Sequence, residues 1–346
     1  MARDPVADLR RIAFLLERAH ESSFRVRAFR GAAAALARLD PEAVASRAAA
    51  GTLTDVNGVG DVTARCVAES VAGEEPVYLR RLEATAGTPV AEGGAALRAA
   101  LRGDCHTHSD WSDGGSPIEE MAETARDLGH EYLVLTDHSP RLTIANGLSP
   151  ERLARQLDVV AELNERLDPF RILTGIEVDI LEDGSLDQTD ALLDRLDVVV
   201  ASVHSKLRMP RAEMTRRMLR AVENPHTDIL GHCTGRNVTS QGRGGKTRPE
   251  SEFDADAVFA ACAEHGVAVE VNSRPERLDP PKRLLRLAVE AGCLVAIDTD
   301  AHAPGQLDWQ PLGCERAAAC GVPVETVVNS WPAERLLEWT RTGATA

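Results

Sequence analysis

The strongest constraint on the fold is an alternation of short apolar segments and amphipathic segments that begins near Asp104 and continues almost to Ala346. The apolar segments are typical of buried strands, and the segments between them have the periodicity of helices. An alternation of this length predicts parallel strands joined by helices, in a closed or distorted α/β barrel. The predicted strands are 132–135, 171–173, 198–202, 229–230, 267–271 and 294–297, and the predicted helices are 117–128, 150–167, 186–195, 211–223, 255–264, 281–291 and 334–341.

Residue types that bind metal ions gather at the ends of these predicted strands. One residue separates His106 from His108, so a strand carrying both would point their imidazoles to the same side. Neutral imidazoles combined with carboxylates suit Zn, Mn or Fe ions. A single histidine at a strand end is more often a structural residue, but the recurrence of six favours a metal site. The candidate ligands are His106, His108, Asp113, His138, Glu177, His204, His232, Asp300 and His302.

Other residues beside these candidates are expected to play supporting roles. Asp104, Asp137 and Asp298 adjoin candidate ligands, and we expect such carboxylates to orient metal-bound imidazoles. Cys105 and Cys233 also adjoin ligands, but neighbouring side chains on a strand point to opposite faces. We therefore expect both cysteines to be small buried fillers.

The first 85 residues have a different pattern, which predicts helices over 5–21 and 24–39 and a third, short helix from Pro41. The glycines of Gly58-Val59-Gly60 precede another helix and predict the hairpin of a helix-hairpin-helix unit, whose backbone N–H groups can approach a phosphate. A simple glycine turn between helices is the alternative. Twelve arginines balance twelve acidic residues here, yet no acid lies between Glu21 and Asp40. The DNA-binding candidates are Arg25, Arg27, Arg30, Gly58 and Gly60.

The segment Phe24–Arg30 followed by this hairpin resembles the small N-terminal helical domain of family X DNA polymerases. In that family the domain grips the 5′-phosphate side of a DNA gap. The hairpin helix of the present chain lacks the lysine that the lyase activity of some members requires, so we expect no lyase chemistry. The connector that follows is too short to encode a polymerase palm, so we expect no polymerase activity.

From Asp104 onward the chain resembles the PHP (polymerase and histidinol phosphatase) family. The resemblance covers about 103–341 and depends on the order of H-x-H, S-D-G, T-D-H-S, G-x-E, S-V-H-S, I-L-G-H and D-T-D-A-H. It implies a distorted (β/α)7 barrel of the PHP type, preceded by the small all-α helix-hairpin-helix domain. The expected division is a helical DNA-binding-like domain at 1–85, a linker at 86–103 and a metal-dependent phosphoesterase domain at 104–346.

The resemblance also implies three divalent ions, Zn or Mn with Fe as a further possibility. One ion would be held by His106, His108, Glu177 and Asp300, which would act in catalysis through the metal and an activated water. The second would use Glu177, His204 and His232, and the third Asp113, His138 and His302. The main candidates for binding phosphate at the rim are Arg141, Lys206, Arg236 and Arg274. The other basic residues that could clamp phosphates there are Arg208, Arg243, Lys246, Arg248 and Arg277.

A net charge of −15 argues against a polyanionic partner, but three divalent ions would make the site itself positive. No apolar run is long enough to cross a membrane, and the seven cysteines show no C-x-x-C spacing, which favours the cytoplasm. The first hypothesis is a phosphoesterase acting on DNA ends, as a 3′→5′ exonuclease or 3′-phosphatase. The alternatives are a small-molecule phosphatase of the histidinol-phosphate type and a non-catalytic DNA-binding adapter.

Overall fold

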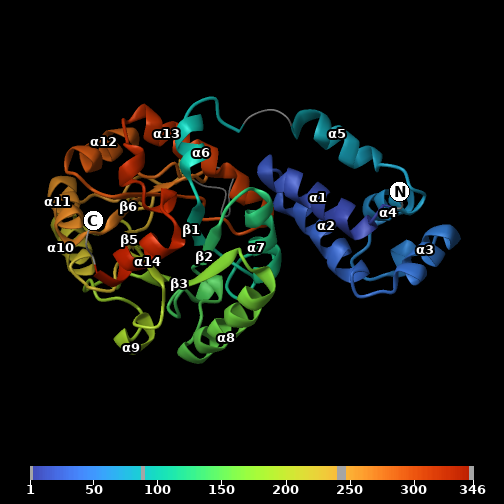
Figure 1. Ribbon diagram of the computed structural model, residues 1–346, viewed down its shortest axis with the longest axis horizontal. Coiled ribbons are helices and arrows are strands. Elements are labelled where there is room, and N and C mark those ends of the chain that lie inside the picture. The colour runs from blue at the N-terminus through green and yellow to red at the C-terminus, as the bar shows by residue number, and fades with distance from the viewer. Residues whose placement is uncertain (1–2, 87–89, 240–246, 343–346) are drawn as a thin grey trace. The chain divides into compact units, whose positions relative to one another are not determined.

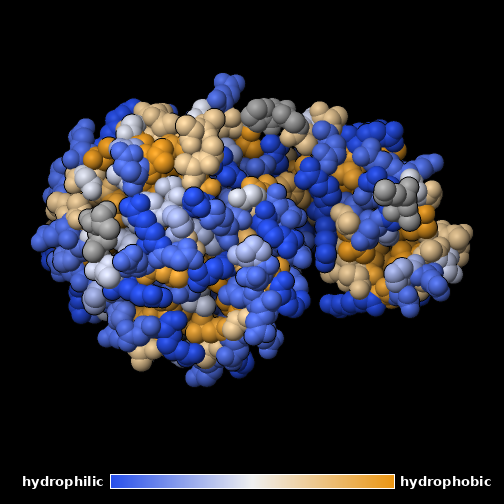
Figure 2. Space-filling model, viewed as in Figure 1, coloured by the Kyte–Doolittle hydropathy of each residue, from blue (hydrophilic) through white to orange (hydrophobic). Residues whose placement is uncertain are grey.

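A computed structural model describes residues 3–86, 90–239 and 247–342 (Figure 1). The chain divides into two compact units, Met1–Pro89 and Val90–Ala346. The space-filling view shows mostly hydrophilic residues on the visible face of each unit, with hydrophobic residues in smaller areas (Figure 2). Among the helices of the described residues, none is long and apolar enough to span a membrane.

The first unit is entirely helical. Asp4 caps the first helix by accepting hydrogen bonds from the backbone of Val6 and Ala7, at 2.8 and 3.3 Å. Apolar side chains of these helices, including Leu9, Ile12 and Phe29, form one buried core. The helices are α1 (Pro5–Arg18), α2 (Ser23–Leu36), α3 (Pro41–Ala50), α4 (Asp61–Val71) and α5 (Val77–Ala86), with the 3-10 turn η1 (Leu53–Asp55) before α4.

The second unit contains a sheet of seven parallel strands in the order β1 to β7. A parallel bridge between Thr107 and Ala301 brings the two edge strands together, so the sheet nearly closes into a barrel. The strands are β1 (Gly103–Thr107), β2 (Tyr132–Leu135), β3 (Arg171–Asp179), β4 (Val198–Ser202), β5 (Ile229–Leu230), β6 (Ala268–Asn272) and β7 (Val295–Asp298). This arrangement confirms the predicted fold class.

Helices surround this sheet and pack their apolar faces on it (Figure 1). They are α6 (Ala95–Ala100), α7 (Ile118–Asp127), α8 (Pro150–Leu167), α9 (Asp190–Leu193), α10 (Arg211–Val222), α11 (Ala255–His265), α12 (Lys282–Glu290), α13 (Gln310–Ala319) and α14 (Ala333–Thr342). Shorter 3-10 turns are η2 (Thr143–Ala145), η3 (Pro304–Trp309), η4 (Val324–Thr326) and η5 (Val328–Ser330). Helix α13 and these turns were not predicted from the sequence.

Strand β3 is longer than the predicted 171–173, because it continues through Gly175 to Asp179. Its first half pairs with β2 and its second half with β4. A Cβ atom at Gly175 would lie 2.8 Å from both Val134 Cγ1 and Val198 O, so only glycine allows this close approach. The extension places Glu177 inside a strand, whereas the sequence predicted it in the loop that follows.

Candidate metal centre

The nine predicted ligands come together at the rim formed by the C-terminal ends of the barrel strands. His106 and His108 begin the set, and their rings lie 5.1 Å apart between centroids. Both side chains are completely buried. The remaining residues follow or end later strands: Asp113 after β1, His138 after β2, Glu177 in β3, His204 after β4, His232 after β5, and Asp300 and His302 after β7.

Glu177 lies at the centre of this group and is 1% exposed. Its Oε1 is 2.8 Å from His232 Nε2 and 3.1 Å from His204 Nε2. Its Oε2 is 2.8 Å from His138 Nδ1, 3.3 Å from His106 Nε2 and 3.6 Å from His108 Nε2. One carboxylate therefore touches five imidazoles, which is the position that a bridging ligand requires.

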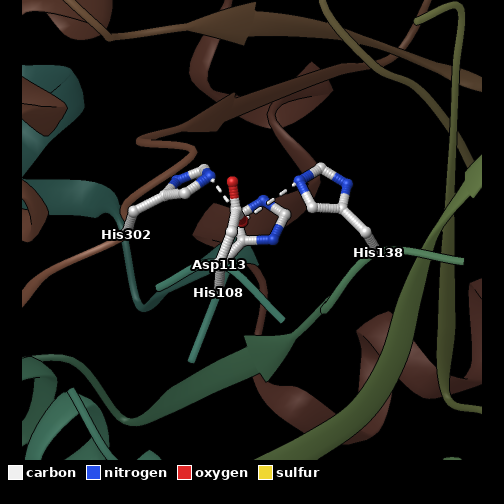
Figure 3. Close-up of side chains that lie close together, drawn as sticks. All are labelled: His108, Asp113, His138 and His302. Carbon is white, nitrogen blue, oxygen red and sulfur yellow. Dashed lines mark ion pairs between the residues drawn. The ribbon is translucent and has the colours of Figure 1, made fainter. Parts of the chain in front are cut away.

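A second carboxylate, Asp113, lies between His302 and His138, with His108 beside it (Figure 3). Its Oδ1 lies 3.2 Å from His302 Nε2 and 3.4 Å from His138 Nε2. The ligand atoms of His108, Asp113, His138 and His302 all lie within 4.8 Å of one another. The structure thus brings the predicted third-ion ligands together, with His108 beside them.

Asp300 completes the set in a backbone conformation that non-glycine residues rarely adopt, with φ of 52°. Its Oδ1 lies 3.4 Å from His108 Nε2, and its Oδ2 lies 3.0 Å from Arg277 Nε. Arg274 donates a hydrogen bond of 2.7 Å to its carbonyl oxygen. These contacts fix the carboxylate toward the histidines.

Several imidazoles are oriented by acceptors at the nitrogen that faces away from the centre. Glu270 Oε1 lies 2.6 Å from His106 Nδ1, and Asp179 contacts His204 Nδ1. An acceptor at Nδ1 keeps the proton there and leaves the Nε2 lone pair for a metal ion. His302 differs, because its Nδ1 lies between an acceptor, the carbonyl oxygen of Asp300 at 2.9 Å, and a donor, Arg274 Nη1 at 2.8 Å.

The sequence assigned this orienting role to Asp104, Asp137 and Asp298, and that assignment is wrong. Among the described residues, their hydrogen bonds go to backbone N–H groups, hydroxyls and side-chain amides, and none reaches an imidazole. Asp104 and Asp137 therefore brace the segments that follow β7 and β1, and Asp298 connects β1 to Asn329. The sequence did contain a signal for Glu270 and Asp179. Glu270 lies two residues before Asn272 and Asp179 two residues after Glu177, and residues at this spacing on a strand face the same side.

The electrostatics of the cluster depend on a balance between burial and opposite charges. Burial opposes ionisation of Glu177, but His204, His106 and His138 hold the pKa of its carboxyl well below the usual range. Burial likewise opposes a charge on His138, yet Glu177 and Asp113 raise its pKa to about 10. Burial and the neighbouring His302 and His138 keep the pKa of His108 well below its usual value.

These buried carboxylates thus need positive charge at the positions where the imidazole Nε2 atoms converge. Within the described residues, His106 Nε2, His108 Nε2 and His204 Nε2 have no hydrogen-bond partner although they are buried. Buried polar atoms without partners are costly, and a cation would satisfy them while supplying the missing charge. The donor set of neutral imidazoles and carboxylates fits divalent transition-metal ions.

The predicted phosphate-binding residues have different environments. Arg274 is nearly buried at the centre, where its Nη1 lies 2.8 Å from His302 Nδ1. Arg236 donates a hydrogen bond of 3.0 Å to the carbonyl of Arg277, beside the centre. Arg141 and Lys206 have side chains 69% and 63% exposed, so both extend from the rim into solvent. Arg243 and Lys246 lie outside the described residues.

In the helical unit the candidate DNA-binding arginines differ in their burial and in their ion pairs. Arg30 makes two hydrogen bonds to Glu17, at 2.7 and 2.8 Å, and both side chains are largely buried. That guanidinium is committed to the fold, which the sequence did not predict. Arg25 is exposed and lies 3.1 Å from Glu21, and Arg27 is exposed.

The two glycines of the hairpin have separate structural roles. Gly58 has a φ of 94°, a conformation that side chains disfavour, and its backbone turns the chain toward α4. Gly60 is the residue before α4, and its N–H donates a hydrogen bond of 3.0 Å to Thr63 Oγ1. The hairpin therefore ends at the start of a helix, as predicted.

In the barrel, Cys105 and Cys233 are buried in apolar clusters, as predicted for small fillers.

The barrel and this cluster of histidines and carboxylates define a metal-dependent phosphoesterase of the PHP class. Residues 104–274 match the PHP domain family, and residues 3–75 match a helix-hairpin-helix domain family. The chain belongs to the PHP family.

Two relatives indicate how the chain is related to other proteins. It is 40% identical over 230 residues to "DNA polymerase/3'-5' exonuclease PolX" of Bacillus subtilis, a match covering 66% of this chain but 39% of that protein. It is 30% identical over 210 residues to a "probable phosphatase" of Thermoanaerobacter sp., covering 58% of this chain and 78% of that protein. The chain thus spans well under half the length of the polymerase relative.

Among solved structures, the histidinol phosphate phosphatase of Lactococcus lactis, complexed with zinc, L-histidinol and phosphate, superposes with a TM-score of 0.44 at 17% identity. That superposition covers 64% of this chain and 92% of the other.

Proposed function

We propose that this protein hydrolyses phosphate esters at DNA ends, as a 3′→5′ exonuclease or a 3′-phosphatase, with three divalent Zn or Mn ions. The observation that carries the proposal is the convergence of five imidazoles on Glu177, with the other candidate ligands beside them at the C-terminal rim of the barrel, where active sites of such folds lie. A structural metal site needs fewer donors and no open rim, so this convergence favours an enzyme over the adapter hypothesis.

The nine residues would divide into three sets, of which two share Glu177. His106, His108, Glu177 and Asp300 would hold the first, Glu177, His204 and His232 the second, and Asp113, His138 and His302 the third. When bound, such ions supply a hydroxide near neutral pH and neutralise charge on a phosphoryl group.

The protein's own residues prepare this site. Arg274 and Arg277 lower the pKa of the Asp300 carboxyl well below its usual value, against the effect of burial, so that it is ionised and ready to bind a cation. The low pKa of Glu177 has the same consequence. Arg274 also places a positive guanidinium beside His302, where it can contact the phosphate of a substrate.

Several observations favour DNA over a small ester. A helix-hairpin-helix family match covers 3–75, and its hairpin leads into the N-terminus of α4. The exposed Arg25 and Arg27 lie on α2 of the same unit. The relative PolX is named as a 3′-5′ exonuclease, and its match covers 66% of this chain.

The second candidate function is a small-molecule phosphatase of the histidinol-phosphate type. It is favoured by the relatives named as probable phosphatases, since this chain covers 78% of one such protein. The two candidates differ in the substrate that the same centre would accept.

A comparison of substrates separates them. Protein loaded with Mn²⁺ or Zn²⁺ is assayed on single-stranded DNA, on a primer with a 3′-phosphate and on histidinol phosphate, with His106→Ala as the inactive control. We expect turnover of a DNA substrate and its loss in His106→Ala. Turnover of histidinol phosphate alone would refute the proposal, and a metal-loaded protein inactive on every substrate would favour the adapter.

A further inference from the structure

A second feature of the barrel rim is a groove of about 910 Å³ beside the loop that follows β5. Four guanidinium groups line it, and we call it the arginine groove. Its basic residues are Arg211, Arg236, Arg248 and Arg283. None of these arginines coordinates the candidate metal centre.

Three helices begin at this groove. Arg211 is the first residue of α10, Ala255 the first of α11, and Arg283 the second of α12. The N-terminal end of a helix carries a partial positive charge and unpaired N–H groups. The helix ends therefore add to the positive potential of the four arginines and favour an anionic ligand.

The four arginines of the groove face three acids: Glu250 and Glu252 line it, and Asp254 caps α11 at its edge. Glu250 is shared, because it lies 3.5 Å from Arg236 Nη1 and also contacts Arg283. Arg211 lies 3.2 Å from Asp254, and both side chains are mostly exposed. Such exposed pairs are weak and leave the guanidinium available to a phosphate.

A backbone carbonyl positions Arg248, and two carbonyls position Arg236 in addition to its contact with Glu250. Arg248 Nε donates a hydrogen bond of 2.5 Å to the carbonyl of Gly235, and no carboxylate of the described residues forms an ion pair with it. Arg236 is held by the carbonyls of Arg277 and Leu278. Backbone carbonyls orient these side chains without cancelling their charge, in a chain whose net charge is −15.

The segments that contain Arg236 and Arg277 lie between the groove and the metal centre. Gly235 N donates a hydrogen bond of 2.8 Å to the carbonyl of His232, so the loop leads from a candidate ligand directly to Arg236. Arg236 in turn contacts the carbonyl of Arg277, whose Nε lies 3.0 Å from Asp300 Oδ2. These contacts connect the wall of the groove to two candidate ligands, His232 and Asp300.

We propose that the arginine groove binds the phosphodiester backbone of the DNA strand whose 3′ end occupies the metal centre. The inference rests on the proposed function and extends it, since it assigns a polymeric substrate and a site for the nucleotides upstream of the reacting end. Guanidinium groups bind phosphates by paired hydrogen bonds, and such contacts give affinity without sequence preference.

The test is a binding measurement on the full-length, Mn²⁺-loaded protein. The probe is a fluorescent single-stranded DNA with phosphorothioate linkages at its 3′ end, which resist hydrolysis, and Kd is measured between about 50 and about 200 mM salt. The variant is Arg248→Gln with Arg283→Gln. We expect at least a tenfold weaker Kd at low salt, and a slope of log Kd against log salt smaller by roughly 0.7 for each phosphate that the variant no longer neutralises.

Matched control variants distinguish the loss of positive charge in the groove from a loss of folding. Arg166→Gln removes an arginine of similar exposure on α8, paired with Glu119 at 2.8 Å, and should leave Kd unchanged. Arg248→Lys with Arg283→Lys keeps the charges and should restore most of the binding. Hydrolysis of p-nitrophenyl phosphate, which reaches only the centre, should keep its kcat/KM in all of these variants.

The outcomes distinguish the two proposals. An unchanged Kd and salt slope in the glutamine variant would refute DNA binding by the arginine groove, even if the wild type degrades DNA. A wild type that binds inorganic phosphate there but no DNA would also overturn it. The protein could also bind DNA through the groove but hydrolyse only small esters. That result would support DNA binding by the arginine groove and refute the proposed function.

Discussion

The carboxylate of Glu270 lies 2.6 Å from Nδ1 of His106, and both side chains are completely buried. Its other oxygen accepts a hydrogen bond from the backbone N–H of His232, so one side chain supports two candidate ligands. Partners of this kind fix the tautomer and the direction of a metal-binding imidazole. Glu270 is thus a positioning residue, because it contacts the ring nitrogen of His106 that faces away from Glu177.

Replacing Glu270 with glutamine should weaken metal binding because the neutral amide holds the His106 Nδ1 proton less firmly. We expect an affinity for Mn²⁺ or Zn²⁺ lower by about tenfold to a hundredfold, measured by competition with a chromogenic chelator. Glu290→Gln, at an exposed position on α12, is the matched control. Unchanged affinity in a folded Glu270→Gln protein would contradict the positioning role of Glu270.

Arg30 and Arg27 should respond differently to the same change. Arg30→Gln leaves the carboxylate of Glu17, whose side chain is 2% exposed, without its main partner. We expect the free energy of unfolding to fall by about 3 kcal/mol, measured by urea denaturation. Arg27→Gln should change stability by less than about 0.5 kcal/mol and instead weaken DNA binding. Equal stability of the two variants would show that the ion pair is not structural.

Because His130 is buried, we expect the free energy of unfolding to depend on pH in the acid range. Burial and the nearby Arg98 lower the pKa of His130 to about 3, despite its contact with Gln310. The folded protein therefore keeps this imidazole neutral, whereas the unfolded chain binds a proton once the pH falls below the usual histidine value. The stabilisation is present at neutral pH and is lost progressively as the pH falls toward the folded-state pKa.

For the wild type, we expect His130 to account for a loss of about 3 kcal/mol of unfolding free energy between about pH 6.5 and about pH 4. His130→Gln should remove this part of the pH dependence, and His265→Gln, at an exposed position, should retain it. Parallel pH profiles for wild type and His130→Gln would refute the prediction.

The sequence predicted the barrel and the convergence of the candidate ligands at one rim for a physical reason. The carboxyl ends of parallel strands meet at one rim, so residues such as His138 and His204 must converge once the strands are known. The apolar runs of β2, β4 and β5 are bounded by polar residues, and their limits agree with those predicted.

Other features could not be derived from local patterns. The strand spacing of Glu270 and Asp179 marks them as polar residues of the site, but the imidazoles that they orient are distant in sequence and meet them only in the folded barrel. Arg30 was expected at a DNA surface because nothing in its neighbourhood in the sequence shows that Glu17 packs against it. The length of β3 depended on the close approach permitted by Gly175, which is a tertiary contact.

The most direct test of the central claim is a metal titration that follows activity and stoichiometry together. Protein stripped with a chelator is titrated with Mn²⁺, while bound metal and release of phosphate from a 3′-phosphate primer are measured for wild type and Glu177→Gln. For the wild type, we expect activity to appear with metal and to level off near three ions for each chain.

Glu177→Gln should bind fewer ions and lose on the order of 10³-fold in kcat, the equivalent of about 4 kcal/mol of transition-state stabilisation. Full activity without metal, or a Glu177→Gln protein that keeps both its ions and its rate, would contradict the assignment of this cluster as the catalytic centre.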